Sequence, residues 1–340
     1  MIITRTPYRI SFFGGGTDHP QWYRVHGGAV LSTAIDKYCY VSCRNLPPFF
    51  EHKHRIVYSH IETVNKIDEI QHPVVRECLK YLKHPTGVEI HHDGDLPARS
   101  GIGTSSSFTV GLLNALHALQ GRFPNKQTLA LQAIEIEQKR MRETVGSQDQ
   151  VAATYGGFNH IQFLPNEEIV VQPVKTHPDI LACFKQHLML FFTGFTRMAA
   201  FLEKTKLDNF SKREKELHTL MQLAERALSI LSSGNISEFG PLLHESWRLK
   251  QSLAEGVTTE VLDDIYQNAL AAGAAGGKIL GAGGGGFLLL FVPPERQQAV
   301  RDRLHRLLEI PFNFDTEGSK IIFQHKPQNE GTLQFAAKTV

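Results

Sequence analysis

The stretch LPARSGIGTSSS, residues 96–107, is the part of the sequence that decides how the fold is interpreted. It leaves a strand pattern, turns at Gly101 and Gly103, and opens a helix in which apolar residues such as Phe108 and Leu112 recur at turn spacing. Glycine lets backbone N–H groups approach an anion closely, and the free donors and dipole of the first helical turn favour negative charge. The stretch therefore predicts a phosphate cradle. A capping turn, which would need only one of the hydroxyl groups, is the alternative.

This cradle is not the loop of a P-loop NTPase. Such a loop reads GxxxxGK[ST], and no Lys-Ser or Lys-Thr follows a glycine at that spacing in this chain. A second segment, GAGGGG at residues 281–286, contains GxGxxG but follows a helical pattern and precedes the apolar run 287–292. A dinucleotide-binding fingerprint needs the opposite order. The segment either lines a ligand cleft or lets two backbones pack closely.

A third glycine-rich segment, PYRISFFGGGTD, occupies residues 7–18. Its alternating apolar residues predict a strand that delivers Arg9 to a glycine turn, and the turn ends in Thr17 and Asp18. A hydroxyl and a carboxylate at such a turn suit the recognition of sugar hydroxyl groups. A hairpin turn without a ligand is the alternative.

Composition limits the classes of protein that the chain can represent. Its 340 residues are 41% hydrophobic and 21% charged, which is typical of a globular protein of about two domains. The net charge of +2 provides no broad positive field, so we expect no nucleic-acid partner and no membrane partner. The sequence shows neither a signal peptide nor an apolar run of about 18 residues, and its 4 cysteines form no CxxC pair, so we expect a cytoplasmic location and reduced cysteines. Nothing in the sequence indicates an oligomeric state.

The periodicity predicts a mixed chain. Short strand patterns dominate the first half, whereas the second half begins with a strand at residues 188–192 and then becomes mostly helical. Helices are predicted over 126–143, 238–253, 259–272 and 294–308. Because strands and helices do not alternate strictly, the pattern favours an α+β architecture over a doubly wound parallel sheet.

Taken together and in this order, PYRISFFGGGTD, PxxxGIGTSSS and GAGGGG resemble the three motifs of the GHMP kinases, the superfamily of galactokinase, homoserine kinase, mevalonate kinase and phosphomevalonate kinase. The first motif and the run GSQDQ at 146–150 are most similar to those of bacterial D-glycero-D-manno-heptose 7-phosphate kinases. The resemblance implies an N-terminal, ATP-binding domain like ribosomal protein S5 domain 2 over 1–178 and a ferredoxin-like C-terminal domain over 179–326. Residues 327–340 are then a tail, and the nucleotide and substrate bind between the domains.

The resemblance also implies which residues bind ATP and Mg²⁺. The ATP-binding residues would be Gly101, Gly103, Thr104, Ser105 and Ser106. Ser105 matches the serine that ligates Mg²⁺, and Glu137 is the best match for its acidic partner. Glu135 competes for that role, because the run IEIE leaves the register open, and both glutamates could instead face solvent.

Asp149 matches the catalytic aspartate of the family, and Arg9 would lie beside it. An aspartate that follows Gly-Ser could instead cap a helix. The substrate-binding residues implied by the resemblance are Thr17, Asp18, Gly283, Gly284, Gly285 and Arg197. Arg197 follows a strand and is the candidate for binding a substrate phosphate.

The implied activity is ATP-dependent phosphorylation of the anomeric hydroxyl of D-glycero-D-manno-heptose 7-phosphate. The product would be the 1,7-bisphosphate, for nucleotide-activated heptose used in bacterial surface polysaccharide. One alternative is another anomeric sugar kinase, such as an L-fucose kinase. The other is a catalytically silent sensor that binds sugar and ATP, against which Asp149 and the hydroxyl cluster argue.

Overall fold

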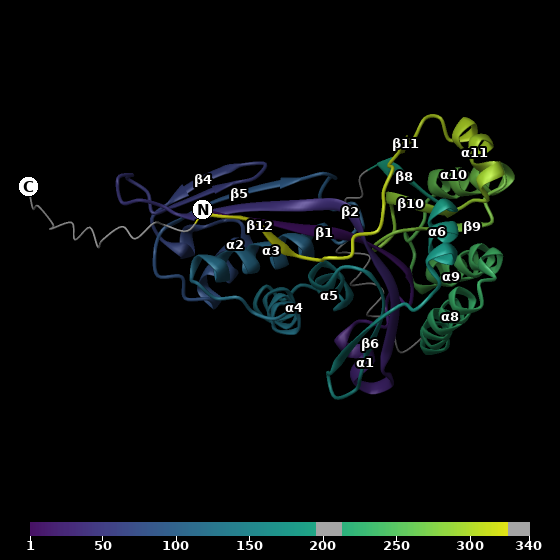
Figure 1. Ribbon diagram of the computed structural model, residues 1–340, viewed down its shortest axis with the longest axis horizontal. Helices are drawn as coiled ribbons and strands as arrows, with labels where there is room; N and C mark the ends of the chain where they lie inside the picture. Colours follow the sequence, from purple (N-terminus) through teal and green to yellow (C-terminus); the bar gives the residue numbers. More distant parts are fainter. Residues whose placement is uncertain (195–212, 326–340) are drawn as a thin grey trace, which may run out of the picture.

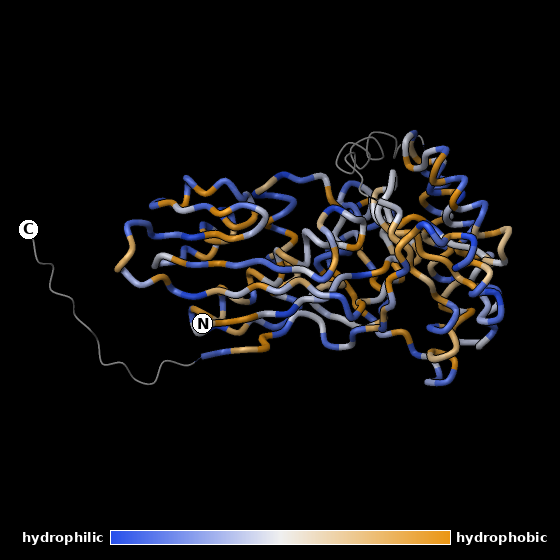
Figure 2. The backbone as a smooth tube through the Cα atoms, turned by 90° about the horizontal axis from the view of Figure 1, so that it is seen from above, coloured by the Kyte–Doolittle hydropathy of each residue, from blue (hydrophilic) through white to orange (hydrophobic). Residues whose placement is uncertain are grey.

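The computed structural model describes residues 1–194 and 213–325. The molecule is elongated, with long strands along one end and most helices of the second half of the chain at the other (Figure 1). The second view shows the same lengthwise arrangement (Figure 2). The strands form two sheets, and the expected α+β class is confirmed.

The larger sheet is built on two long antiparallel strands, β1 (Ile2–Phe13) and β2 (Gly28–Asn45). Its order is β12-β1-β2-β5-β3-β4, and β6 pairs with the first part of β2 and with β7. The pairing of β1 with β2 shifts register after Pro7, which has no N–H to donate. The other strands are β3 (His54–Val57), β4 (Ile61–Val64), β5 (Val88–Gly94), β6 (Phe158–Phe163), β7 (Ile169–Pro173) and β12 (Lys320–Gln324).

One face of this sheet is covered by helices (Figure 1). The central helix, α3 (Thr104–Leu119), packs on β1 and β2 and is buried along most of its length, which accounts for its unusually apolar sequence. Around it lie α2 (Pro73–Tyr81), α4 (Lys126–Ile134) with the π-helical turn η2 (Glu135–Arg140), and α5 (Gln148–Tyr155). The short elements α1 (Pro20–His26) and η1 (Ile67–Glu69) complete this half.

The smaller sheet has the order β11-β8-β10-β9 and is antiparallel. Its strands are β8 (Leu188–Gly194), β9 (Gly276–Ile279), β10 (Gly286–Phe291) and β11 (Leu308–Glu309). The helices of this half are α6 (Pro178–Gln186), α8 (Glu214–Ser233), η4 (Ile236–Glu238), α9 (Phe239–Leu253), α10 (Glu260–Ala271), η5 (Pro294–Arg296) and α11 (Gln297–Arg303). Among the described residues, no helix is both long and apolar enough to span a membrane.

A shared aromatic core joins the two halves. Phe12 of β1 packs edge-on against Phe184 of α6 and Phe239 of α9, with ring centroids 5.7 and 5.6 Å apart. Phe13 packs against Phe239 at 5.2 Å, and all four rings are fully buried. Such pairs stabilise beyond the burial of their area, so the end of β1 is held firmly where the halves meet.

The chain returns to the larger sheet at its end, which the sequence did not predict. Strand β12 pairs with β1, and Phe314 forms a bridge with Ile35 of β2. The predicted second domain, 179–326, therefore includes a segment that belongs to the larger sheet, while the boundary at 178/179 stays a prediction. We call residues 1–173 and 313–325 the large-sheet half, and the described residues between them the small-sheet half.

Two predicted helices are shorter than expected. The helix predicted over 126–143 ends in the π-helical turn at Arg140, and the one predicted over 294–308 ends at Arg303 because the chain then enters β11. The glycine run 281–286 follows strand β9, not a helix directly, so it is the turn of an antiparallel hairpin. Strand β9 was missed because a four-residue strand that begins with two glycines carries little strand signal.

Candidate active site

A cleft of about 260 Å³ lies between the two halves and brings the three glycine-rich segments together. Its lining residues are Arg9, Ser11, Gly15, Gly16, Asp18, His19, Arg99, Gly101, Gly103, Thr104, Ser105, Ser106, Glu137, Val145, Gly146, Gln148, Asp149, Leu220, Ser246, Lys250, Leu253, Lys278, Leu280, Gly281, Ala282, Gly283 and Gly285. Segments far apart in the sequence thus form one concave surface on which several polar and charged side chains converge, the form expected of a ligand site.

The 96–107 stretch forms the N-terminal end of α3 at one wall of the cleft. Gly103, at the N-cap position, has φ +75°, and no side chain caps the helix, so the N–H groups of its first turn face the cleft. Gly101 has φ +85°, and a Cβ there would lie 2.6 Å from the carbonyl oxygen of Leu280 in the β9–β10 hairpin. The loop and the hairpin therefore pack backbone against backbone, which only glycine allows.

Arg9 and Asp149 form a bidentate pair beside this loop. Arg9 Nε donates to Asp149 Oδ1 at 2.7 Å, and Nη2 donates to Oδ2 at 2.8 Å. The third contact, from Nη1 to the carbonyl oxygen of Gly101 at 2.7 Å, fixes the guanidinium against the glycine loop. The Arg9 side chain is 5% exposed and that of Asp149 is 24% exposed, so the carboxylate is the member of the pair that remains accessible from the cleft.

Glu137 is a buried carboxylate at the inner end of the cleft. Oε1 accepts a hydrogen bond from Thr109 at 2.6 Å, while Oε2 accepts hydrogen bonds from Ser106 at 2.9 Å and from Gln150. Burial raises the pKa of Glu137 to about 7, although these three hydrogen bonds lower it. All three donors are neutral, so the buried carboxylate has no positively charged partner among them. A cation bound at this point would supply that partner.

The raised pKa of Glu137 predicts a pH-dependent stability. The folded protein holds a proton on Glu137 up to a pH of about 7, whereas the unfolded chain loses it near 4.5. The free energy of unfolding should therefore fall as pH rises from 4.5 to about 7, by about 3 kcal/mol from this residue. Chemical denaturation of the metal-free protein at several pH values, compared with Glu137→Gln, measures this. Parallel stability curves for the two proteins would contradict the assignment.

Asp18 ties the N-terminal glycine turn to the segment that precedes α5. Its Oδ1 accepts a hydrogen bond from Gly16 N at 2.9 Å, and its Oδ2 accepts one from Gln148 N at 3.2 Å. A Cβ on Gly146 would lie 1.9 Å from Asp18 Oδ2, so Gly146 leaves room for this contact. Asp18 is among the residues that line the cleft, although only 1% of its surface is exposed.

Comparison with known proteins agrees with this geometry. Residues 71–157 match the model of the GHMP kinases N terminal domain, and residues 220–310 match that of the GHMP kinases C terminal domain. The D-glycero-alpha-D-manno-heptose 7-phosphate kinase of Campylobacter jejuni is 30% identical over 333 residues, which cover 94% of this chain and 98% of that protein. The chain belongs to the GHMP kinases.

Two further comparisons extend this result. The bifunctional fucokinase/GDP-fucose pyrophosphorylase of Arabidopsis thaliana is 26% identical over 77% of this chain and 27% of that protein. The crystal structure of a D-glycero-D-manno-heptose 1-phosphate kinase from Bacteroides thetaiotaomicron has a TM-score of 0.77 at 24% identity, over 96% of this chain and all of that chain. GHMP kinases use ATP as phosphoryl donor. Because the relatives are sugar kinases, this chain is a phosphotransferase with an alcohol group as acceptor.

Within this GHMP kinase, most of the residues singled out from the sequence line the cleft, but Thr17 does not. Thr17 is fully buried, and its hydroxyl group donates towards the carbonyl oxygens of Gly14 and Ala29 and accepts from Ala29 N. Thr17 therefore shapes the glycine turn from within, and its substrate-binding role stays a prediction that the contacts of its hydroxyl group do not support. Gly284 also turns away from the cleft and donates its N–H to Val257 O, while Gly283 and Gly285 line the cleft.

The structure bears on both residues predicted to ligate Mg²⁺, Glu137 and Ser105. Glu137 lines the cleft, whereas Glu135 is paired with Tyr81 and Arg140 and does not line it. Ser105 and Ser106 both line the cleft, but Ser106 is the serine hydrogen-bonded to Glu137. Arg197 lies outside the described residues.

Two lysines that no motif had indicated also line the cleft. Lys278 of β9 is 5% exposed, and its Nζ donates to the carbonyl oxygen of Phe12 at 2.7 Å. Lys250 of α9 donates to the carbonyl oxygens of Ile279 and Gly281 at 2.9 and 2.5 Å. With Arg9, they bring positive charge to the floor of the cleft, which suits phosphorylated ligands.

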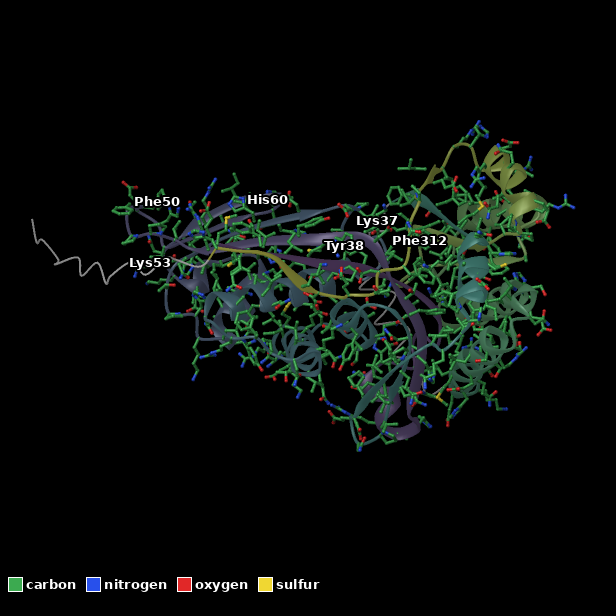
Figure 3. All side chains as sticks on the ribbon, viewed as in Figure 1. Lys37, Tyr38, Phe50, Lys53, His60 and Phe312 are labelled. Atoms are coloured by element: carbon green, nitrogen blue, oxygen red, sulfur yellow. The ribbon has the colours of Figure 1, made fainter. Side chains whose placement is uncertain are left out.

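Two histidines of the first half of the sequence, His60 and His91, do not line this cleft. Phe50 and Lys53 lie at the outer end of the larger sheet, and His60 lies further along the same sheet, in the turn between β3 and β4 (Figure 3). His91 contacts Glu89 at 3.0 Å as part of an ion-pair network with Arg44 and Arg55.

Proposed function

We propose that this kinase transfers the γ-phosphoryl group of ATP to the anomeric hydroxyl of D-glycero-D-manno-heptose 7-phosphate. The proposal rests chiefly on one observation: the cleft-facing Asp149, held by Arg9, lies directly beside the glycine loop at the start of α3. A proton acceptor and a phosphate cradle at this distance are what phosphoryl transfer to a hydroxyl group needs. The choice of heptose 7-phosphate is supported by the similarity to the Campylobacter kinase along nearly the whole chain.

In the proposed reaction, the anomeric oxygen attacks the γ-phosphorus of ATP. The new O–P bond forms as the bond between the γ-phosphorus and the β,γ-bridging oxygen breaks, and ADP leaves. The hydroxyl proton passes to the carboxylate of Asp149, which lies in the cleft and has the geometry to orient the hydroxyl group. Arg9 holds that carboxylate in one orientation and offsets negative charge that develops nearby.

The helix N-terminus at Gly103 and Thr104 would hold the phosphates of ATP, with Gly101, Ser105 and Ser106 around them. Glu137 and the serine hydroxyl groups make an oxygen-rich set that fits Mg²⁺, because the carboxylate is buried among neutral donors. When bound, Mg²⁺ would neutralise charge on the phosphates.

On the sugar side, Asp18, Gly283 and Gly285 would contact the acceptor, since they line the same cleft as the ATP loop. Arg197 remains the proposed partner of the substrate phosphate on the basis of the sequence.

Alanine substitutions at the two serines should identify which hydroxyl group serves Mg²⁺. Ser105→Ala and Ser106→Ala should each raise the Mg²⁺ concentration needed for half-maximal rate, by about three- to tenfold, if both contribute an oxygen atom. Ser106→Ala should have the larger effect, because it also removes a hydrogen bond from the buried Glu137. Titration of Mg²⁺ at saturating ATP measures this. An unchanged requirement in both variants would place Mg²⁺ elsewhere.

The substrate itself is tested by coupled ADP release. The assay compares D-glycero-D-manno-heptose 7-phosphate, the unphosphorylated heptose, L-fucose and galactose at equal concentrations. The heptose 7-phosphate should have the highest kcat/KM, and Arg197→Ala should narrow its advantage over the free heptose by about ten- to a hundredfold. Equal turnover of the two heptoses by the wild type would refute the substrate assignment but not the kinase reaction.

A second candidate is an L-fucose kinase, which the similarity to the Arabidopsis protein favours. It would be chosen if L-fucose had the highest kcat/KM in the same assay. A catalytically silent sensor would release no ADP with any of these sugars.

A further inference from the structure

We propose that His26, Glu214 and His218 form a binding site for one Zn²⁺ ion, separate from the Mg²⁺ of the reaction, which holds α8 against α1. One nitrogen of each histidine and one carboxylate oxygen of Glu214 all lie within 4.8 Å of one another. The helices α1 and α8 belong to different halves of the molecule, so the site would bridge the two halves close to the glycine turn at residues 14–18, which precedes α1.

The geometry of the three donors is close to that of a bound ion. His26 Nδ1 lies 3.8 Å from Glu214 Oε1, and His218 Nε2 lies 3.7 Å from the same oxygen atom. Tetrahedral Zn²⁺ with bonds of about 2.0–2.1 Å places its ligand atoms about 3.3 Å apart. The two histidine–glutamate separations would therefore shorten by about half an ångström on coordination, while the two histidine nitrogens, which lie within 4.8 Å of each other, would close by at most about 1.5 Å.

The local structure pre-arranges the three side chains. Glu214 and His218 are one turn apart on α8, so their side chains share a face of the helix. His26 stacks on Trp22 of α1 at 4.1 Å between ring centroids, and the His218 ring lies edge-on to both, at 5.0 Å from Trp22 and 5.1 Å from His26. The two imidazole rings are perpendicular and do not stack on each other, and each has a nitrogen within 3.8 Å of the same Glu214 oxygen atom.

The donor set selects the class of metal. Two imidazole nitrogens and one carboxylate oxygen suit Zn²⁺, whereas Mg²⁺ prefers oxygen ligands alone. The side chains are between 26% and 53% exposed, so water can complete the coordination. In residues 1–194 and 213–325, the ion-pair partners of Glu214 are these two histidines, so no lysine or arginine competes with a metal there.

The position of the site gives the ion a structural role. Helix α1 begins two residues after Asp18, and α8 contributes Leu220 to the cleft and packs on β1 and β2. An ion between α1 and α8 would stabilise the folded protein and fix the position of the glycine turn at residues 14–18 relative to the small-sheet half.

The test uses the full-length protein, freed of metals with a chelator and kept in millimolar Mg²⁺. ZnCl₂ is titrated by calorimetry and by thermal shift, and Co²⁺ serves as a spectroscopic probe of tetrahedral coordination. We expect one ion per chain with a micromolar Kd and a Zn²⁺-dependent rise in Tm. His218→Ala and Glu214→Gln should each weaken binding at least tenfold and abolish the rise in Tm.

The matched control is His305→Ala, which removes an exposed histidine outside the cluster and should leave Zn²⁺ binding unchanged. Glu214→Gln keeps the size and helix position of the side chain, so a loss of binding there cannot be ascribed to misfolding. The proposal fails if the wild type shows no Zn²⁺-dependent rise in Tm, or if His218→Ala and Glu214→Gln bind Zn²⁺ as the wild type does. These readouts need no sugar substrate, so they are independent of the proposed reaction.

Discussion

Asp149→Asn should lower kcat by about a hundredfold or more while ATP still binds. The amide keeps nearly the same shape but cannot accept the proton of the sugar hydroxyl, and a loss of that size corresponds to about 2.7 kcal/mol in the barrier. It also replaces one of the two Asp149 oxygen atoms that accept hydrogen bonds from Arg9, so some loss of stability accompanies it. Steady-state kinetics with fluorescent-nucleotide binding and a melting curve separates the three effects.

Asp179→Asn is the matched control, because Asp179 is also in the first turn of a helix but is exposed and remote from the cleft. It should leave kcat unchanged. If folded Asp149→Asn turns over within a few-fold of the wild type, Asp149 is not the proton acceptor. A large loss of kcat without a change in the pH–rate profile would leave it a purely orienting residue.

Gly101→Ala should reduce kcat/KM for ATP by about a hundredfold. Its Cβ would lie 2.6 Å from Leu280 O, and φ +85° strains any other residue, so the glycine loop and the β9–β10 hairpin must move apart. A displacement of about 1 Å at a catalytic loop has effects of this order. Because Arg9 Nη1 is hydrogen-bonded to the Gly101 carbonyl, the Arg9–Asp149 pair would shift as well.

Gly121→Ala separates steric contact from backbone strain. Gly121 has φ +71°, and a Cβ there meets nothing within 4 Å, so its substitution introduces similar strain without a clash. It should lower Tm modestly and leave kcat/KM for ATP unchanged. If the two variants lose activity equally, the close packing of the loop on the hairpin is not what matters.

The parts of the site that the sequence predicted are those with special backbone requirements. Glycine runs and a hydroxyl-rich start of a helix can be recognised in the sequence alone, because they reflect local φ values and unpaired N–H groups. Their assembly around one cleft followed from the family resemblance, as did the position of Arg9 beside Asp149. The roles assigned to these residues stay predictions until the variants are measured.

The parts that the sequence did not predict depend on tertiary packing. Lys250 and Lys278 lie in an ordinary helix and an ordinary short strand, and only the fold carries them to the cleft. Thr17 lies in a glycine turn of the kind that binds ligands. Whether its hydroxyl group faces a ligand or the backbone depends on β2, which supplies its hydrogen-bond partner Ala29. Strand β12 was missed because its pairing with β1 joins residues more than 300 positions apart.

The return of β12 to β1 brings the two ends of the described chain together, with His325 N donating to Met1 O at 2.9 Å. The small-sheet half is therefore topologically an insertion, connected to the rest by two covalent tethers, one before α6 and one after β11. A body held at two points, and by the fully buried rings of Phe12, Phe184 and Phe239, cannot swivel freely about either tether. The close backbone contact between Gly281 and Gly101 is therefore fixed by how the two halves are joined, and not by the loops alone.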